Sequence, residues 1–193
     1  MPCPEKFKES LLKHNVEEEV INQIFDGYES PKDISTKKKK FAFFSRAMKE
    51  MDKTMDFNKR YEVMDWGACC KGGARDKAVK KLAKELAGKS LEEKLKALWN
   101  VPNMGHPSLK EDGTISTGIY YKCAEGFKCA CPCFHNEKLQ EPISSTYCLC
   151  CAGHFRYHYQ NALGVKLKTA KVVSSPLESL GKEPCVFIYE IVE

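Results

Sequence analysis

Six of the eleven cysteines and three of the five histidines lie within residues 129–160. The six thiols form two groups, Cys129-x-Cys131-x-Cys133 and Cys148-x-Cys150-Cys151. Thiolates at this density are typical ligands of zinc, cuprous copper or an iron–sulfur cluster. Neither group is the C-x-x-C knuckle of a zinc ribbon or the C-x-x-C-x-x-C run of a bacterial ferredoxin, although Cys148 and Cys151 are three positions apart. The pattern therefore indicates a soft-metal site without identifying the metal.

Two predicted elements would bring these thiols together. The alternation within "FKCACPC", residues 127–133, predicts a short strand that ends at Pro132, and side chains two apart on a strand share a face. Residues 148–163 have a helical pattern. Cys148 would lie in the first turn of that helix, where backbone N–H groups and the helix dipole lower the pKa of a thiol.

The predicted helix places Cys150, His154 and His158 along one face, because residues four apart are neighbours on a helix. A glycine-rich segment around Cys69 and Cys70 could supply further thiols. We therefore predict zinc or an iron–sulfur cluster as cofactor. The predicted ligands are Cys70, Cys131, Cys148 and Cys150, with Cys69, Cys133, Cys151 and His154 as further candidates.

The thiols could also serve as disulfides or as catalytic groups. A disulfide framework fits poorly with an odd cysteine count and with the adjacent pairs Cys69-Cys70 and Cys150-Cys151. Catalysis would need a base beside the nucleophile. Cys150 with His154 is a conceivable pair, although a single helix staggers the two side chains. The sequence contains no nucleophile elbow, phosphate loop or dinucleotide motif.

Composition and charge limit the classes of binding partner that we expect. The chain has 193 residues, 42% of them apolar, and a net charge of +5 with acids and bases interleaved. This balance disfavours nucleic acid, and the lysine run 37–40 lacks the aromatic platform of a nucleic-acid site. The first residues lack the order of a signal peptide, and no apolar run could cross a bilayer. We expect a cytoplasmic protein without a membrane partner, and a homodimer is compatible with the sequence.

The elements predict an α+β fold in which a helical N-terminal half packs on a small antiparallel sheet with one long helix. The predicted division is a helical segment, residues 1–100, followed by a cysteine-rich α+β domain, residues 101–193, in one compact unit. Ser90 and Glu93 form a capping box at a helix start. Asp112-Gly113 predicts a hairpin turn. Residues 165–173 and 185–191 have the strongest strand patterns.

The last third of the chain resembles a known family. The resemblance depends on a cysteine-rich helix start, a helix that ends in Leu-Gly, a strand, a turn with a glycine, and a final strand after a cysteine. Their positions here are Cys148, Cys150, Gly153, Leu163, Gly164, 165–173, Gly181 and 185–191. This order is similar to that of 4-vinyl-reductase-type domains and of L-2-amino-thiazoline-4-carboxylate hydrolase-like proteins. Upstream, "GACCKGG" and "CACPC" resemble the paired cysteines of an uncharacterised cysteine-rich branch.

The resemblance implies an α+β domain that binds a small hydrophobic molecule or a metal between its helices and sheet. The resemblance identifies no catalytic residue. Cys133 and Cys151 are additional to the simpler cysteine pairs that the resemblance leads us to expect. We therefore expect a metal-binding protein that binds or senses a small molecule. The alternative is a metal- or thiol-dependent hydrolase of a small heterocycle or amide, and a third interpretation is an interaction module with a structural zinc.

Overall fold

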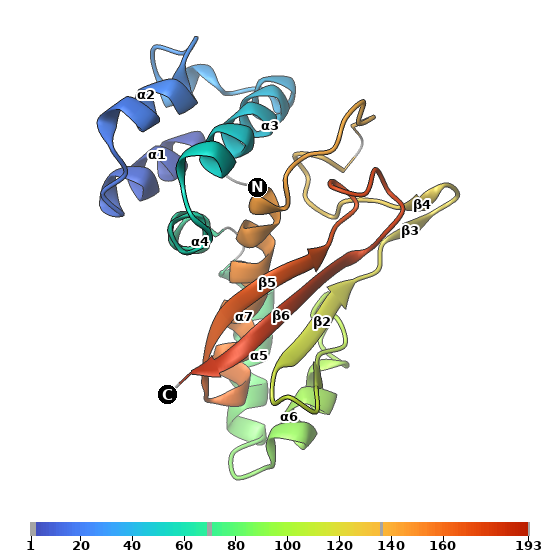
Figure 1. The fold of residues 1–193 in the computed structure, drawn as a ribbon. Coiled ribbons are helices and arrows are strands. Elements are labelled where there is room, and N and C mark those ends of the chain that lie inside the picture. The colour runs from blue at the N-terminus through green and yellow to red at the C-terminus, as the bar shows by residue number, and fades with distance from the viewer. Residues whose placement is uncertain (1–2, 69–70, 136, 193) are drawn as a thin grey trace.

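The computed structural model describes residues 3–68, 71–135 and 137–192 and has the predicted α+β architecture (Figure 1). The helices are α1 (Pro4–Lys13), α2 (Glu18–Phe25), η1 (Pro31–Asp33), α3 (Lys37–Thr54), α4 (Phe57–Trp66), α5 (Gly73–Glu85), α6 (Leu91–Leu98), η2 (Ser145–Cys148) and α7 (Leu149–Leu163). The strands are β1 (Ser108–Leu109), β2 (Ile115–Ile119), β3 (Lys122–Cys123), β4 (Gly126–Phe127), β5 (Lys166–Ser174) and β6 (Cys185–Val192).

Local chemistry fixes several element boundaries as the sequence predicts. At α6, the Ser90 hydroxyl accepts from the Glu93 N–H at 3.3 Å, and the Ser90 N–H donates to the Glu93 carboxylate at 2.8 Å. Between β1 and β2, Lys110 N donates to Thr114 O at 2.8 Å across the predicted hairpin turn. These bonds satisfy backbone groups that helix and strand ends leave open.

The main sheet has the strand order β1-β2-β6-β5, with every neighbouring pair antiparallel. The β5–β6 register shifts between Thr169 and Lys171 and again between Val172 and Ser174, so the edge strand β5 carries two irregularities. Helix α7 runs behind the sheet, and α1–α3 gather at one end of the molecule (Figure 1). The Tyr189 hydroxyl of β6 donates to Ala152 O of α7 at 3.0 Å, which ties the sheet to the helix.

The strand predicted from Phe127 to Pro132 is wrong beyond Phe127, where β4 ends. Residues 128–133 follow β4 as an irregular loop and turn. The Cys131 carbonyl accepts the N–H groups of Phe134 and His135, each at 2.9 Å, so the chain turns back immediately. Pro132 within this turn has no N–H to give to a sheet ladder. The alternation of cysteines reflects burial of alternate side chains in a loop, because Cys129, Cys131 and Cys133 are all buried.

Helix α4 packs closely on α7 because Gly153 has no side chain. A Cβ at this position would lie 2.7 Å from the Asp65 carboxylate and 3.1 Å from Ala68 Cβ. The Arg156 guanidinium donates two hydrogen bonds to Asp65, at 2.7 and 2.6 Å, in a largely buried ion pair. The apolar core accordingly includes buried residues of both halves of the chain, from Phe7 to Tyr189.

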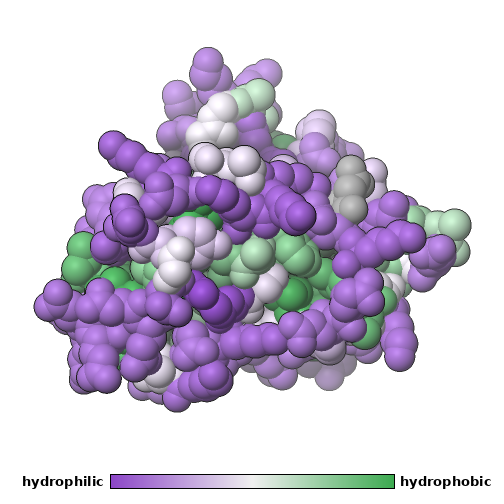
Figure 2. Space-filling view, turned by 90° about the horizontal axis from the view of Figure 1, so that it is seen from above, coloured by the Kyte–Doolittle hydropathy of each residue, from purple (hydrophilic) through white to green (hydrophobic). Residues whose placement is uncertain are grey.

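The outside of the molecule is mostly hydrophilic, with apolar residues in a band across the face that Figure 2 shows. Within the described residues, no helix has the length and apolarity that crossing a membrane would require.

Candidate functional site

A cavity of about 540 Å³ lies beside α7 and collects several residues that the sequence singles out. We call it the α7 cavity. Its lining comes from α5, α7, β2 and the loops 103–106, 120–121 and 130–132. The lining residues are Arg75, Asn103, Gly105, His106, Gly118, Ile119, Tyr120, Tyr121, Ala130, Cys131, Pro132, Cys151, His154 and Phe155. The wall is mainly aromatic and aliphatic, with a few polar groups, as is usual for small-molecule sites.

Buried polar contacts hold the floor of the cavity. Tyr159 of α7 is fully buried, and its hydroxyl hydrogen bonds with Thr117 Oγ1 at 2.7 Å and donates to Met104 O. Gly105 has φ +69°, and a Cβ there would lie 2.7 Å from Gly118 O. Only glycine combines this backbone conformation with so close an approach. The long helix, β2 and the 103–106 loop are thereby fixed relative to one another.

The polar end of the cavity is an arginine–histidine contact. Arg75 of α5 donates from Nη1 to Nε2 of His154 on α7. Burial, followed by the positive charge of Arg75, lowers the pKa of His154 to about 3. A guanidinium only donates, so Nε2 must be the acceptor and the neutral ring carries its proton on Nδ1. His154 is therefore a fixed neutral group near pH 7, with Nε2 already engaged.

Cys131 is the thiol most firmly positioned in the cavity wall. Its Sγ lies 3.1 Å from the Tyr147 hydroxyl, and both residues are buried. Tyr147 is itself held by ring contacts with Phe134 and Phe44, at centroid distances of 4.5 and 5.6 Å. The turn that closes on the Cys131 carbonyl fixes the backbone on the other side.

The thiols around Cys131 are held in their protonated form by burial. Burial, followed by the interaction with Cys131, raises the pKa of Cys133 to about 11 and that of Cys185 to about 12. The pKa of Cys129 and of Cys151 is also raised, again mainly by burial. Such thiols are weak nucleophiles at neutral pH, although a bound metal would displace their protons.

The predicted lowering of the Cys148 pKa is wrong. Cys148 is the N-cap of α7, as the sequence suggests, yet its side chain is only 1% exposed. Burial raises the pKa of its thiol well above the ordinary value, and charges on Cys185 and Cys129 would raise it more. A thiolate in a dry site loses more solvation energy than a helix terminus returns.

The structure brings some predicted ligands together and separates others. Cys131, Cys151 and His154 share the α7 cavity, and Cys133 and Cys148 are buried near Cys131. Cys150 instead lines a narrow crevice with Cys3, against α1, α3 and α4. The predicted ligands Cys69 and Cys70 lie outside the described residues. Among residues 3–68, 71–135 and 137–192, no three His, Cys, Asp or Glu side chains are placed to hold one metal ion.

The sequence did not point to Arg75 or Tyr147. Arg75 lies in a lysine-rich helix where a further cation looks ordinary, and only the fold brings it to His154. Tyr147 stands just before the second cysteine group, and that proximity was the one available signal. Cys150 and His154 are poorly placed to act as nucleophile and base, since their side chains line different cavities.

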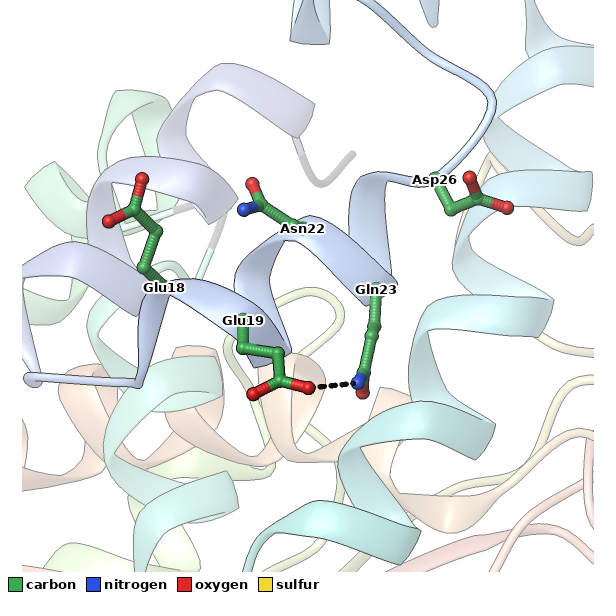
Figure 3. A pocket seen from close by; sticks show the side chains of 5 residues that line it. All are labelled: Glu18, Glu19, Asn22, Gln23 and Asp26. Carbon is green, nitrogen blue, oxygen red and sulfur yellow. Dashed lines mark hydrogen bonds between the residues drawn. The ribbon is translucent and has the colours of Figure 1, made fainter.

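Two other hollows differ in character from the α7 cavity. One lies over α2 and is lined by Glu18, Glu19, Asn22, Gln23 and Asp26, as Figure 3 shows. Its side chains project from an exposed helix, and the bond drawn there joins Gln23 to Glu19 at 3.5 Å. The other, of about 610 Å³, lies against residues 134–135, 137–140, 176–177 and 180–181 and includes Cys123 and Cys129. Neither contains the Arg75–His154 contact.

Comparison with known proteins gave no match: no family model, curated protein or solved structure is similar to this chain.

Proposed function

We propose that the protein binds a small, largely apolar molecule in the α7 cavity. The observation that carries the proposal is the cavity itself, at about 540 Å³. Its volume lies within the roughly 300–1,000 Å³ range of small-molecule sites. Ile119, Tyr120 and Phe155 offer an apolar surface, while Arg75 and His154 give one polar end. A molecule of one or two rings suits this division.

The zinc or iron–sulfur cofactor stays a prediction. It is supported by the concentration of buried thiols around Cys131, and a metal there would be bound by thiolates whose protons it displaces. Iron and acid-labile sulfide, or stoichiometric zinc, in anaerobically purified protein would support it. A metal-free preparation that keeps its fold and its ligand affinity would contradict it.

The proposal includes a cytoplasmic location. Cys3, Cys123, Cys129, Cys131, Cys133, Cys148, Cys151 and Cys185 are reduced thiols, as expected in a reducing compartment. A homodimer stays a prediction and is tested by light scattering of the purified protein.

A neutral fluorescent probe tests the cavity directly. N-phenyl-1-naphthylamine should bind the protein and increase its emission as it leaves water. Ala130 is exposed and lines the cavity, so Ala130→Trp should fill the entrance without disturbing the core. We expect it to weaken binding by at least about tenfold, or 1.4 kcal/mol.

The matched control is Ala124→Trp, at an exposed turn position between β3 and β4. This variant adds the same ring outside the α7 cavity and should bind the probe as the wild type does. Wild-type protein that does not bind the probe, or equal affinity in the Ala130→Trp variant, would refute the proposed site.

A further inference from the structure

Arg75 occupies a position that local helix energetics do not favour. It lies in the first turn of α5, which begins at Gly73, and its side chain lines the α7 cavity. The N-terminal end of a helix dipole is positive and favours anions, so a cation there gains nothing from the helix. The contact with His154 across the cavity gives the side chain a fixed position instead.

The charge of Arg75 has no counter-ion within the described part of the chain. No described Asp or Glu forms an ion pair with it, and none of the fourteen residues that line the cavity is acidic. The adjacent Asp76 is directed elsewhere, since it accepts from Lys80 at 2.7 Å and from Tyr157 at 3.2 Å. Arg75 is only half-exposed, so water does not fully screen its charge.

The guanidinium retains hydrogen-bonding capacity that His154 does not use. Arginine has five N–H donors in one plane, and the structure assigns a donor on Nη1 to His154. A carboxylate matches the planar fork with two parallel hydrogen bonds, and such charge-assisted bonds are stronger than neutral ones. Among the described residues that line the cavity, Arg75 is the only arginine or lysine.

We infer that the α7 cavity selects a ligand with a flat apolar body and a single carboxylate, and that Arg75 binds that carboxylate. The aromatic wall takes the apolar body, and the arginine sets its orientation. This assignment rests on the proposed function, since it names the class of molecule that the same cavity binds.

Two isosteric probes separate the contribution of charge from that of the rings. 2-Naphthoate carries a carboxylate, and 2-naphthamide presents the same ring with a neutral group of similar shape. By isothermal titration calorimetry, wild-type protein should bind the naphthoate about 10- to 100-fold more tightly than the amide, the range expected for a charge-assisted contact.

Arg75→Gln should abolish this preference while it preserves affinity for the amide, because glutamine removes the positive charge and keeps an N–H donor. The matched control is Lys77→Gln, which removes the same charge from an exposed position of α5. It should keep the full preference, and thermal melting of both variants checks that the fold is retained.

The outcomes separate the inference from the proposal beneath it. Equal affinity of wild-type protein for the two probes would overturn the carboxylate assignment and leave the small-molecule site standing. A preference that survives in the Arg75→Gln variant would overturn the role of Arg75. If neither naphthalene binds and the neutral phenylnaphthylamine also fails, the proposed function itself is refuted.

Discussion

Neighbouring residues of α7 lie in two different environments, one closely packed against α4 and one open to a cavity beside β2. On the side of α4, Gly153 admits the carboxylate of Asp65, and Cys150 fills a crevice against the N-terminal helices. On the side of β2, Cys151 and His154 face a cavity large enough for a ligand. The first side is closed and held by an ion pair, and the second is open and lined by neutral groups together with the cation Arg75. Cysteines that are adjacent in the sequence, such as Cys150 and Cys151, can therefore lie in different environments.

The largest expected effect lies on the closed side. Asp65→Asn removes the charge that Arg156 needs, and the guanidinium stays largely buried without a counter-ion. Breaking one partner of a buried pair costs on the order of 3 kcal/mol. Urea unfolding should show that loss. Glu85→Gln, which breaks the exposed pair with Lys81, is the control and should change stability by under about 0.5 kcal/mol. Equal losses in both variants would remove the distinction between the two sides.

An intermediate effect is expected from His154 on the open side. The pKa of His154 is about 3 in the fold, against about 6.5 in the unfolded chain, so the unfolded state binds the additional proton between these values. Stability from the neutral ring is thus fully present above pH 6.5 and is lost as the pH falls towards 3. Between pH 6.5 and pH 5 the loss is about 1.5 kcal/mol.

The His154→Gln variant should show a correspondingly shallower fall in the free energy of unfolding over that interval. The control is His106→Gln, which removes an imidazole from the same cavity. If wild type and His154→Gln lose stability in parallel below pH 6.5, the neutral state assigned to His154 is wrong.

The smallest effect concerns the reactivity of single thiols. With iodoacetamide at pH 7.5, the exposed Cys3 should react first, and Cys151 should react at least about tenfold more slowly because burial raises its pKa. Cys148 and Cys150 should react only when the protein unfolds. Saturating 2-naphthoate should slow Cys151 further without affecting Cys3. Peptide mapping by mass spectrometry that finds Cys150 modified before Cys151 would reverse the assignment of the two sides.

Much of the fold follows from local sequence patterns. The long helix, the β5–β6 pair, the capping box at Ser90 and the turn at Asp112 each depend on residues close together in the chain. The strand predicted from Phe127 to Pro132 is wrong beyond Phe127, because alternation alone cannot distinguish a strand from a buried loop. There, one turn and Pro132 outweighed the periodicity.

Less of the candidate site than of the fold could be predicted from the sequence, because the site depends on contacts between distant parts of the chain. Spacing identified Cys131, Cys151 and His154 as candidate ligands, and these three residues do line the same cavity. Spacing could not show that Cys150 faces another helix, since that depends on Gly153 and the approach of α4. Nor could it give the sign of the Cys148 pKa shift, because desolvation is a property of the folded surroundings.

The two register shifts in β5 have a consequence for self-association. An outer strand with unpaired backbone groups is a template on which further chains can grow into fibrils. Irregularities bend such a strand, and lysines repel an incoming copy; β5 has both, with Lys166, Lys168 and Lys171 along its length. The register shifts and the lysines of β5 therefore disfavour the addition of further strands at this edge of the sheet.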